Sequence, residues 1–341
     1  DFNGSGSPFA NSNAALTRAS NTVGTLSPSN IVFNNSSCPG AGPFNITSGS
    51  CFPSFVNRWR EFGYSIEGLN EVYHAGSIID PFEIYNATEW NNIQTDSYLV
   101  SKSFKLMNDI DFQNGLFNPI GTTDNSNPSQ VFTGSITPNG KKLLNITISS
   151  SLSGQTGFGV FPNIDHAQIG YFNDPLVIDG LDIDITPNTL SDSVGVIGKA
   201  EGGDLFIQVK NADINTSNVI GVGGILGTAT NDVRIENSGF EGRIISDQDT
   251  VGGLVGSLVT GLGVNLNIRN SYSKLTQLNG SNKVGGILGS DEGAGNTSDF
   301  ESVYVKFIGD NNVGTNELII ASGAGLIGSL GGSATLNNNV V

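Results

Sequence analysis

Residues that support metal and thiol chemistry are scarce in this chain. Its 341 residues include two Cys, two His and one Met. Zinc ribbons, iron–sulfur clusters and cysteine-stapled miniproteins need more ligands or thiols, so the composition excludes them. Charged residues make up only 13% of the chain, and its net charge is −16. This balance argues against a nucleic-acid partner, because neutralising phosphates requires clustered Lys and Arg.

Long apolar runs are missing as well. No run approaches the roughly 18 apolar residues that span a bilayer, and no charged segment followed by an apolar core opens the chain. We therefore expect no membrane insertion. The chain begins at Asp1 instead of Met, so we expect it to be processed or excised. Residues 337–341 show no capping pattern, which predicts that the native chain continues or that another chain covers this end.

Glycine, in contrast, is abundant. It accounts for 46 of the 341 residues, about twice its usual share of roughly 7%. Most of the remaining polarity comes from Asn, Ser and Thr, which favour turns over helices. The composition therefore predicts an all-β chain with many tight corners.

One short phrase of two apolar residues between glycines recurs. It occupies residues 195–198, 224–227, 253–256, 286–289 and 325–328, so its final glycines are 29, 29, 33 and 39 residues apart. Alternating apolar segments follow at residues 233–236, 266–269 and 303–307, and they predict short strands. A unit of about 30 residues with two or three strands is typical of one coil of a solenoid. We predict a right-handed parallel β-helix, also called a β-solenoid.

The phrase itself carries two further expectations. Strand alternation predicts that Leu254 and Val255 point to opposite sides of the coil. The flanking glycines should permit positive φ at the corner and let another backbone approach closely. The spacing between the last repeats is longer, which predicts insertions in surface loops. Because surface loops often carry binding residues, residues 291–299 and 309–318 are the candidate functional loops.

These residues resemble a known family. Residues 222–227 (VGGILG), 251–256 (VGGLVG) and 284–289 (VGGILG) are similar to the GLUG repeat of bacterial secreted and surface proteins, which include large adhesins and domains beside some immunoglobulin-A proteases. Residues 82–148 follow, in order, the opening that precedes such repeats. The resemblance covers about residues 81–330, although the first repeat lacks one glycine and residues 157–161 are a degenerate copy. It implies a solenoid used for attachment or scaffolding more often than for catalysis.

We expect three segments. Residues 1–80 form an N-terminal arm and an irregular cap region, residues 81–150 open the solenoid with a short helix near 87–94, and residues 151–341 form GLUG-type coils. Aromatic residues concentrate between residues 38 and 73, so a binding surface that includes Trp59 is the alternative to a cap. We predict a Cys38–Cys51 disulfide, worth roughly 3 kcal/mol by loop-closure entropy, which would require an oxidising compartment.

Candidate site residues are carboxylates. The alternation in residues 181–185 (LDIDI) puts Asp182 and Asp184 on one outer face, where they could bind a cation or flank a glycosidic bond. A solvated strand face gives the same pattern. Asp291 and Glu292 are further ligand-binding candidates.

The sequence carries little evidence for a metal site or a catalytic motif. Calcium binding at an exposed acidic cluster is an open alternative, with Asp247 and Asp249 as the candidate ligands. No D-x-D-x-D-G loop and no G-x-S-x-G elbow occurs in the sequence. We expect no cofactor otherwise, and no catalytic residues.

The sequence favours an extracellular, non-catalytic adhesin module on a bacterial cell surface or secreted from it. Such a module would bind a glycan or protein on another cell surface through a rigid solenoid. A polysaccharide-acting β-helix enzyme, hydrolase or lyase, is the first alternative, and a purely structural stalk is the second. The sequence names neither the ligand nor the oligomeric state.

Overall fold

The computed structural model describes residues 76–95, 99–113, 115–121, 131–149, 157–186, 193–217, 219–247, 250–259, 263–281, 283–291, 293–308, 326–330 and 333–337. Residues 1–75 of the predicted arm and cap region, which include the predicted Cys38–Cys51 disulfide and Trp59, lie outside these residues. The chain divides into two compact units, Asp1–Glu83 and Ile84–Val341. In the described part of the first unit, Ser77 and Asp80 exchange backbone hydrogen bonds.

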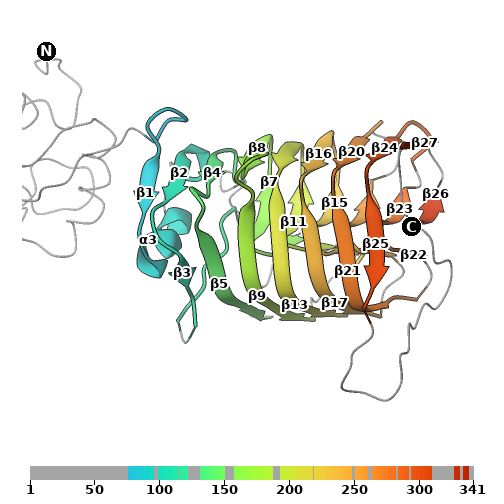
Figure 1. Ribbon diagram of the computed structural model, residues 1–341, viewed down its shortest axis with the longest axis horizontal. Coiled ribbons are helices and arrows are strands. Elements are labelled where there is room, and N and C mark those ends of the chain that lie inside the picture. Colours follow the sequence, from blue (N-terminus) through green and yellow to red (C-terminus); the bar gives the residue numbers. More distant parts are fainter. Residues whose placement is uncertain are drawn as a thin grey trace, which may run out of the picture. The chain divides into compact units, whose positions relative to one another are not determined.

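The second unit is a parallel β-solenoid, as the sequence predicts. Its described strands form four sheets, and strands from successive coils lie side by side in chain order (Figure 1). The nine-strand sheet consists of β1 (Phe82–Ile84), β2 (Ser103–Leu106), β4 (Ser135–Thr137), β8 (Ala167–Ile169), β12 (Gly203–Leu205), β16 (Val233–Glu236), β20 (Asn265–Arg269), β24 (Thr297–Glu301) and β27 (Ser333–Asn337). The seven-strand sheet consists of β3 (Ile110–Asp111), β5 (Lys142–Ser149), β9 (Leu176–Ile185), β13 (Ile207–Thr216), β17 (Gly239–Ser246), β21 (Tyr272–Asn279) and β25 (Tyr304–Phe307).

The other two sheets are built from shorter strands. The six-strand sheet consists of β7 (Phe161–Ile164), β11 (Ile197–Ala200), β15 (Leu226–Ala229), β19 (Val255–Leu258), β23 (Leu288–Asp291) and β26 (Ile327–Leu330). The five-strand sheet consists of β6 (Gly157–Phe158), β10 (Ser193–Val194), β14 (Gly221–Gly223), β18 (Thr250–Gly252) and β22 (Lys283–Gly285). A regular coil therefore contributes four strands instead of the predicted two or three, because two- and three-residue strands leave no visible alternation in a sequence.

Apolar side chains stack in columns along the solenoid interior. Ile183, Ile214, Ile244 and Leu278 occupy equivalent positions on four successive strands of the seven-strand sheet, and all four are buried. Each coil buries this inner face against the coils on either side, which is why the repeated unit folds as part of a stack.

The repeat glycines are required for close packing. None of those among the described residues has a positive φ, so the prediction of left-handed corners at these glycines is wrong. The prediction of close approach is confirmed. A Cβ atom on Gly227 would lie 2.6 Å from the carbonyl oxygen of Gly198, and one on Gly223 would lie 2.7 Å from that of Leu254. Backbone of one coil occupies the space that a side chain of the next would need.

The prediction that Leu254 and Val255 point to opposite sides is also wrong, since both side chains are fully buried. β18 ends at Gly252 and β19 begins at Val255, so the two residues flank a corner between sheets. Alternation holds along a strand and does not continue through a change of direction.

The third predicted strand lies in a different sheet from the other two. Within residues 303–307, Tyr304–Phe307 form β25, which pairs with β21 in the seven-strand sheet. The counterpart of β16 and β20 is β24, whose register with β20 runs from Asn265 opposite Thr297 to Arg269 opposite Glu301. β24 has one large apolar side chain, Phe300, so its alternation is weak in the sequence.

A short helix lies at the start of the second unit, as predicted. α3 (Ala87–Asn92) leads into the 3-10 turn η2 (Ile93–Thr95), and a second turn, η3 (Leu99–Ser101), follows. Asn86 caps α3 by accepting a hydrogen bond from the Glu89 N–H at 3.0 Å, and the Glu89 carboxylate accepts one from the Tyr85 N–H at 2.7 Å. The Trp90 side chain is fully buried. No helix in the described part of the chain is both long and apolar enough to cross a membrane.

Candidate functional site

The outer faces of the seven-strand and nine-strand sheets carry ordered rows of polar side chains. Strands in these sheets pair in register, so equivalent outward residues of successive coils lie about 4.8 Å apart along the solenoid. On β9 the alternation is as predicted: Leu181, Ile183 and Ile185 are buried, while Asp182 and Asp184 are exposed.

Asp182 belongs to an acidic cluster that spans three strands. The register places it beside Asp213 of β13, which in turn lies beside Arg243 of β17. Arg243 donates two hydrogen bonds to the Asp213 carboxylate, from Nε at 2.6 Å and from Nη2 at 2.5 Å. Asp184 accepts a longer hydrogen bond, 3.4 Å, from the Asn215 amide. The cluster therefore contains one bidentate ion pair, Arg243 with Asp213. The other two carboxylates, Asp182 and Asp184, have no cation partner of their own in the described cluster.

Burial raises the pKa of Asp182, and the negative charges of Asp213 and Asp184 raise it further against the opposing effect of Arg243. The hydrogen bond to Asp213 is the main reason that the pKa of Arg243 is raised. A carboxyl group whose pKa is raised in this way has a property that a general acid needs.

The metal candidates receive no support from geometry. Among the described residues, no group of three or more His, Cys, Asp or Glu side chains is arranged to hold a metal ion. Asp247 is exposed just after β17, while Asp249 and Glu292 lie outside the described residues.

Asp291, which the sequence predicts in a surface loop and as a ligand-binding residue, is buried instead. Asp291 is 0% exposed and ends β23, in register with Leu258 of β19. Its carboxylate accepts hydrogen bonds from the Asn296 amide at 3.0 Å and from the Ser298 hydroxyl at 2.9 Å. Asn296 also accepts a hydrogen bond from the Val264 N–H at 2.9 Å. The carboxylate thus organises the turn before β24 and is not presented to a ligand.

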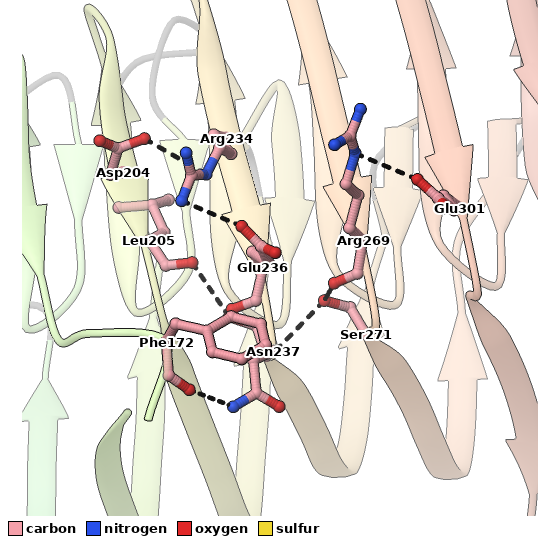
Figure 2. A network of polar contacts seen from close by, with 10 residues as sticks. Phe172, Asp204, Leu205, Arg234, Glu236, Asn237, Arg269, Ser271 and Glu301 are labelled. Carbon is pink, nitrogen blue, oxygen red and sulfur yellow. Dashed lines mark hydrogen bonds and ion pairs between the residues drawn. The ribbon is translucent and has the colours of Figure 1, made fainter. Parts of the chain in front are cut away.

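The nine-strand sheet presents a row of alternating charge. Figure 2 shows Arg234 between Asp204 and Glu236, with N–O distances of 3.6 and 3.0 Å, and Arg269 beside Glu301 at 3.4 Å. Both arginine side chains are nearly half exposed, at 48% and 43%. Exposed ion pairs of this kind contribute roughly 0–1 kcal/mol to stability, so their main effect is to fix a pattern of charge on the surface.

A corner next to this row is fixed by amide and hydroxyl groups. Asn237 has a φ of 47° and donates a hydrogen bond from its amide to the Phe172 carbonyl, 65 residues away in the chain (Figure 2). The Ser271 hydroxyl accepts from the Ser238 N–H at 3.2 Å and donates to the Arg269 carbonyl at 2.7 Å. The Phe172 side chain remains 46% exposed beside this corner.

A second group on the seven-strand sheet, the tyrosine–lysine cluster, was not predicted from the sequence. It consists of Tyr272 and Lys274 on β21 and Tyr304 and Lys306 on β25, which the register places in two adjacent pairs. The two tyrosine rings stack with centroids 5.3 Å apart and planes 14° apart. The sequence does carry a signal for this cluster, because the pattern Y-x-K occurs at residues 272–274 and again 32 residues later at 304–306, close to the spacing of the repeats.

Glu241 on β17 anchors this cluster. Its carboxylate accepts hydrogen bonds from the Tyr272 hydroxyl and the Lys274 ammonium, both at 2.8 Å. Burial acts to raise the pKa of Glu241, but the hydrogen bonds from Lys274 and Tyr272 outweigh it and leave the pKa below its usual value. Burial, with the Glu241 contact, raises the pKa of Tyr272 well above its ordinary value, so the phenol remains protonated.

Comparison with known proteins gives one solved structure. The chain matches no protein-family model and no curated protein. It is similar to the crystal structure of a putative immunoglobulin A1 protease from Bacteroides ovatus, with 18% sequence identity and a TM-score of 0.45. The match covers 77% of this chain and 86% of that chain.

Proposed function

We propose that this chain is an extracellular adhesin module that binds a glycan or protein on another cell surface without catalysis. The observation that supports this best is the in-register presentation of polar side chains along the two long sheets. Such rows repeat every 4.8 Å or so and offer many similar contacts to a long ligand. The localisation, at or outside a bacterial surface, follows from the resemblance to GLUG-repeat proteins.

The mechanism is geometric. Arg234 is already held by Glu236 on its own strand and Arg243 by Asp213 on a neighbouring strand, so both lose little conformational freedom when a ligand binds. Each exposed polar contact adds on the order of 1 kcal/mol or less, and a ligand that touches several coils sums them. A rigid solenoid of this kind can bind an extended partner without a deep pocket.

A glycan array tests the proposal. The purified chain is applied with and without calcium, and bound glycans are then incubated with it in solution to look for cleavage products. Reproducible binding without turnover supports the adhesin function, and loss of binding with a chelator would assign a role to calcium. If no glycan on the array binds, a protein receptor is tested next. Beads coated with the chain are applied to cells, and adhesion that is lost after the cells are treated with protease indicates a protein receptor. Absence of binding in both assays contradicts the proposal.

A polysaccharide-acting enzyme is the second candidate, because of Asp182. Its raised pKa and its position between Asp213 and Asp184 give a carboxyl group next to two carboxylates, the combination that glycoside hydrolysis uses. Turnover of an array hit that disappears in Asp182→Asn but persists in Asp204→Asn would establish this function and remove the adhesin proposal.

A further inference from the structure

We infer that the tyrosine–lysine cluster is a binding subsite for an acidic sugar, a hexose that carries a carboxylate. Tyr304 would supply a flat apolar surface and Lys306 the charge that pairs with the carboxylate. This inference rests on the proposed function, since it names the chemical class of ligand that the adhesin would bind.

The subsite has a rigid base. The Tyr272 ring crosses the backbone of Gly239, where any Cβ atom would collide with the ring. Its hydroxyl oxygen lies 2.9 Å from the side-chain oxygen of Gln208 and 2.8 Å from the Glu241 carboxylate, and its single proton is shared between these two acceptors on two neighbouring strands. The Lys274 ammonium lies 4.5 Å from the ring centroid, within the range of a cation–π contact. These contacts leave the ring little freedom to turn.

Tyr304 presents the apolar surface. It stacks on the fixed Tyr272 ring and is 37% exposed. An aromatic ring that is already ordered offers contact area to a ligand at low entropic cost. The face of a hexose that carries C–H groups has a matching size and polarity, and the Tyr304 hydroxyl can hydrogen-bond to the sugar.

The charges favour a carboxylate-bearing sugar over a neutral one. Lys274 is already paired with Glu241, and the hydrogen bond to Glu241 raises the pKa of Lys274. Lys306 lies in register with Lys274, is exposed, and has no ion-pair partner among the described residues. The two lysines and one glutamate leave one positive charge in excess. On a chain with a net charge of −16, that local excess directs an anion to this place.

Calorimetric titration with defined sugars tests the subsite. The probes are tetragalacturonate and tetramannuronate, both built from hexoses that carry a carboxylate, with lactose as the neutral control. We expect the acidic probes to bind at least tenfold more tightly than lactose, and their affinity to fall as salt rises. Lys306→Gln should weaken acidic binding about tenfold and flatten its salt dependence, whereas Tyr304→Phe should keep most of the affinity that Tyr304→Ala loses.

Controls separate this subsite from the wider proposal. Lys199→Gln removes a lysine on the six-strand sheet that pairs with Glu201, and it should leave acidic-sugar binding unchanged. Thermal unfolding of each variant shows whether the chain is still folded. If the unmodified chain binds glycans on the array, and the Tyr304→Ala and Lys306→Gln variants bind them with the same affinity, the subsite is refuted and the adhesin proposal stands. If neither acidic probe binds at millimolar concentration, the subsite is refuted whatever the array shows.

Discussion

Phe240 packs directly against the backbone of Gly224: a Cβ atom on this glycine would lie 2.5 Å from the Cδ2 atom of the Phe240 ring. It would also lie 2.5 Å from the carbonyl oxygen of Gly253 in the next coil. The same position in the following coils, Gly253 and Gly286, faces Ser273 and Val305. The first glycine of the repeated four-residue phrase is therefore required by a side chain from another sheet as well as by the neighbouring backbone.

Gly224→Ala should destabilise the solenoid by about 3 kcal/mol or more, because the new methyl group meets backbone and an aromatic ring that cannot both move away. The free energy of unfolding from urea titration measures this loss. Gly295→Ala is the matched control, since the nearest atom to a Cβ there is the Gly263 Cα at 3.7 Å. Equal losses in the two variants would contradict the packing explanation.

Asp291→Ala should cost about 2 kcal/mol or more, because the buried Ser298 hydroxyl loses its carboxylate acceptor and the Asn296 amide keeps only the Val259 carbonyl. The loss should appear as a lower urea midpoint and as faster amide exchange at Val264, whose N–H depends on Asn296. Asp204→Ala, which removes an exposed carboxylate 3.6 Å from Arg234, should change stability by less than about 0.5 kcal/mol. Slow exchange at Val264 in Asp291→Ala would mean that the turn does not need the carboxylate.

Asp182→Asn should stabilise the chain at pH 7, but by less than about 0.5 kcal/mol, because solvent screens the charges around this exposed side chain. The pKa of Asp182 is raised in the folded chain, so its ionised form is less favourable there than in the unfolded chain. That destabilisation is fully present above the folded pKa and disappears as pH falls through it toward the ordinary value. The advantage of the Asn variant should shrink over the same pH range when unfolding is measured between pH 7 and pH 3. An advantage that is independent of pH would assign the effect to packing instead.

The fold could be predicted from the sequence to the extent that it repeats. The glycine phrases fix coil length, and the alternation in residues 181–185 correctly places Asp182 and Asp184 outward. The register between coils is less visible in the sequence, although the Y-x-K pattern at residues 272–274 and 304–306 marks it for one pair of strands. Tyr272 bonds to Gln208, 64 residues away, and stacks on Tyr304, so their cluster exists only once each coil is aligned with the next. Asp291 was missed for a related reason, since its burial depends on a core column that the repeat otherwise fills with apolar residues.

The corners between the nine-strand and seven-strand sheets give the last prediction. Asn237, Asn270 and Ser302 follow β16, β20 and β24, and all three have a positive φ, between 47° and 54°. A side chain that branches at Cβ is strained in this conformation, whereas Gly and Asn adopt it readily. Asn270→Gly should therefore leave stability within about 0.5 kcal/mol, and Asn270→Val should lower it by about 1–2 kcal/mol. Urea unfolding of both variants gives the comparison, and if the Val variant were as stable as the Gly variant, backbone conformation would not be what selects Asn at this corner.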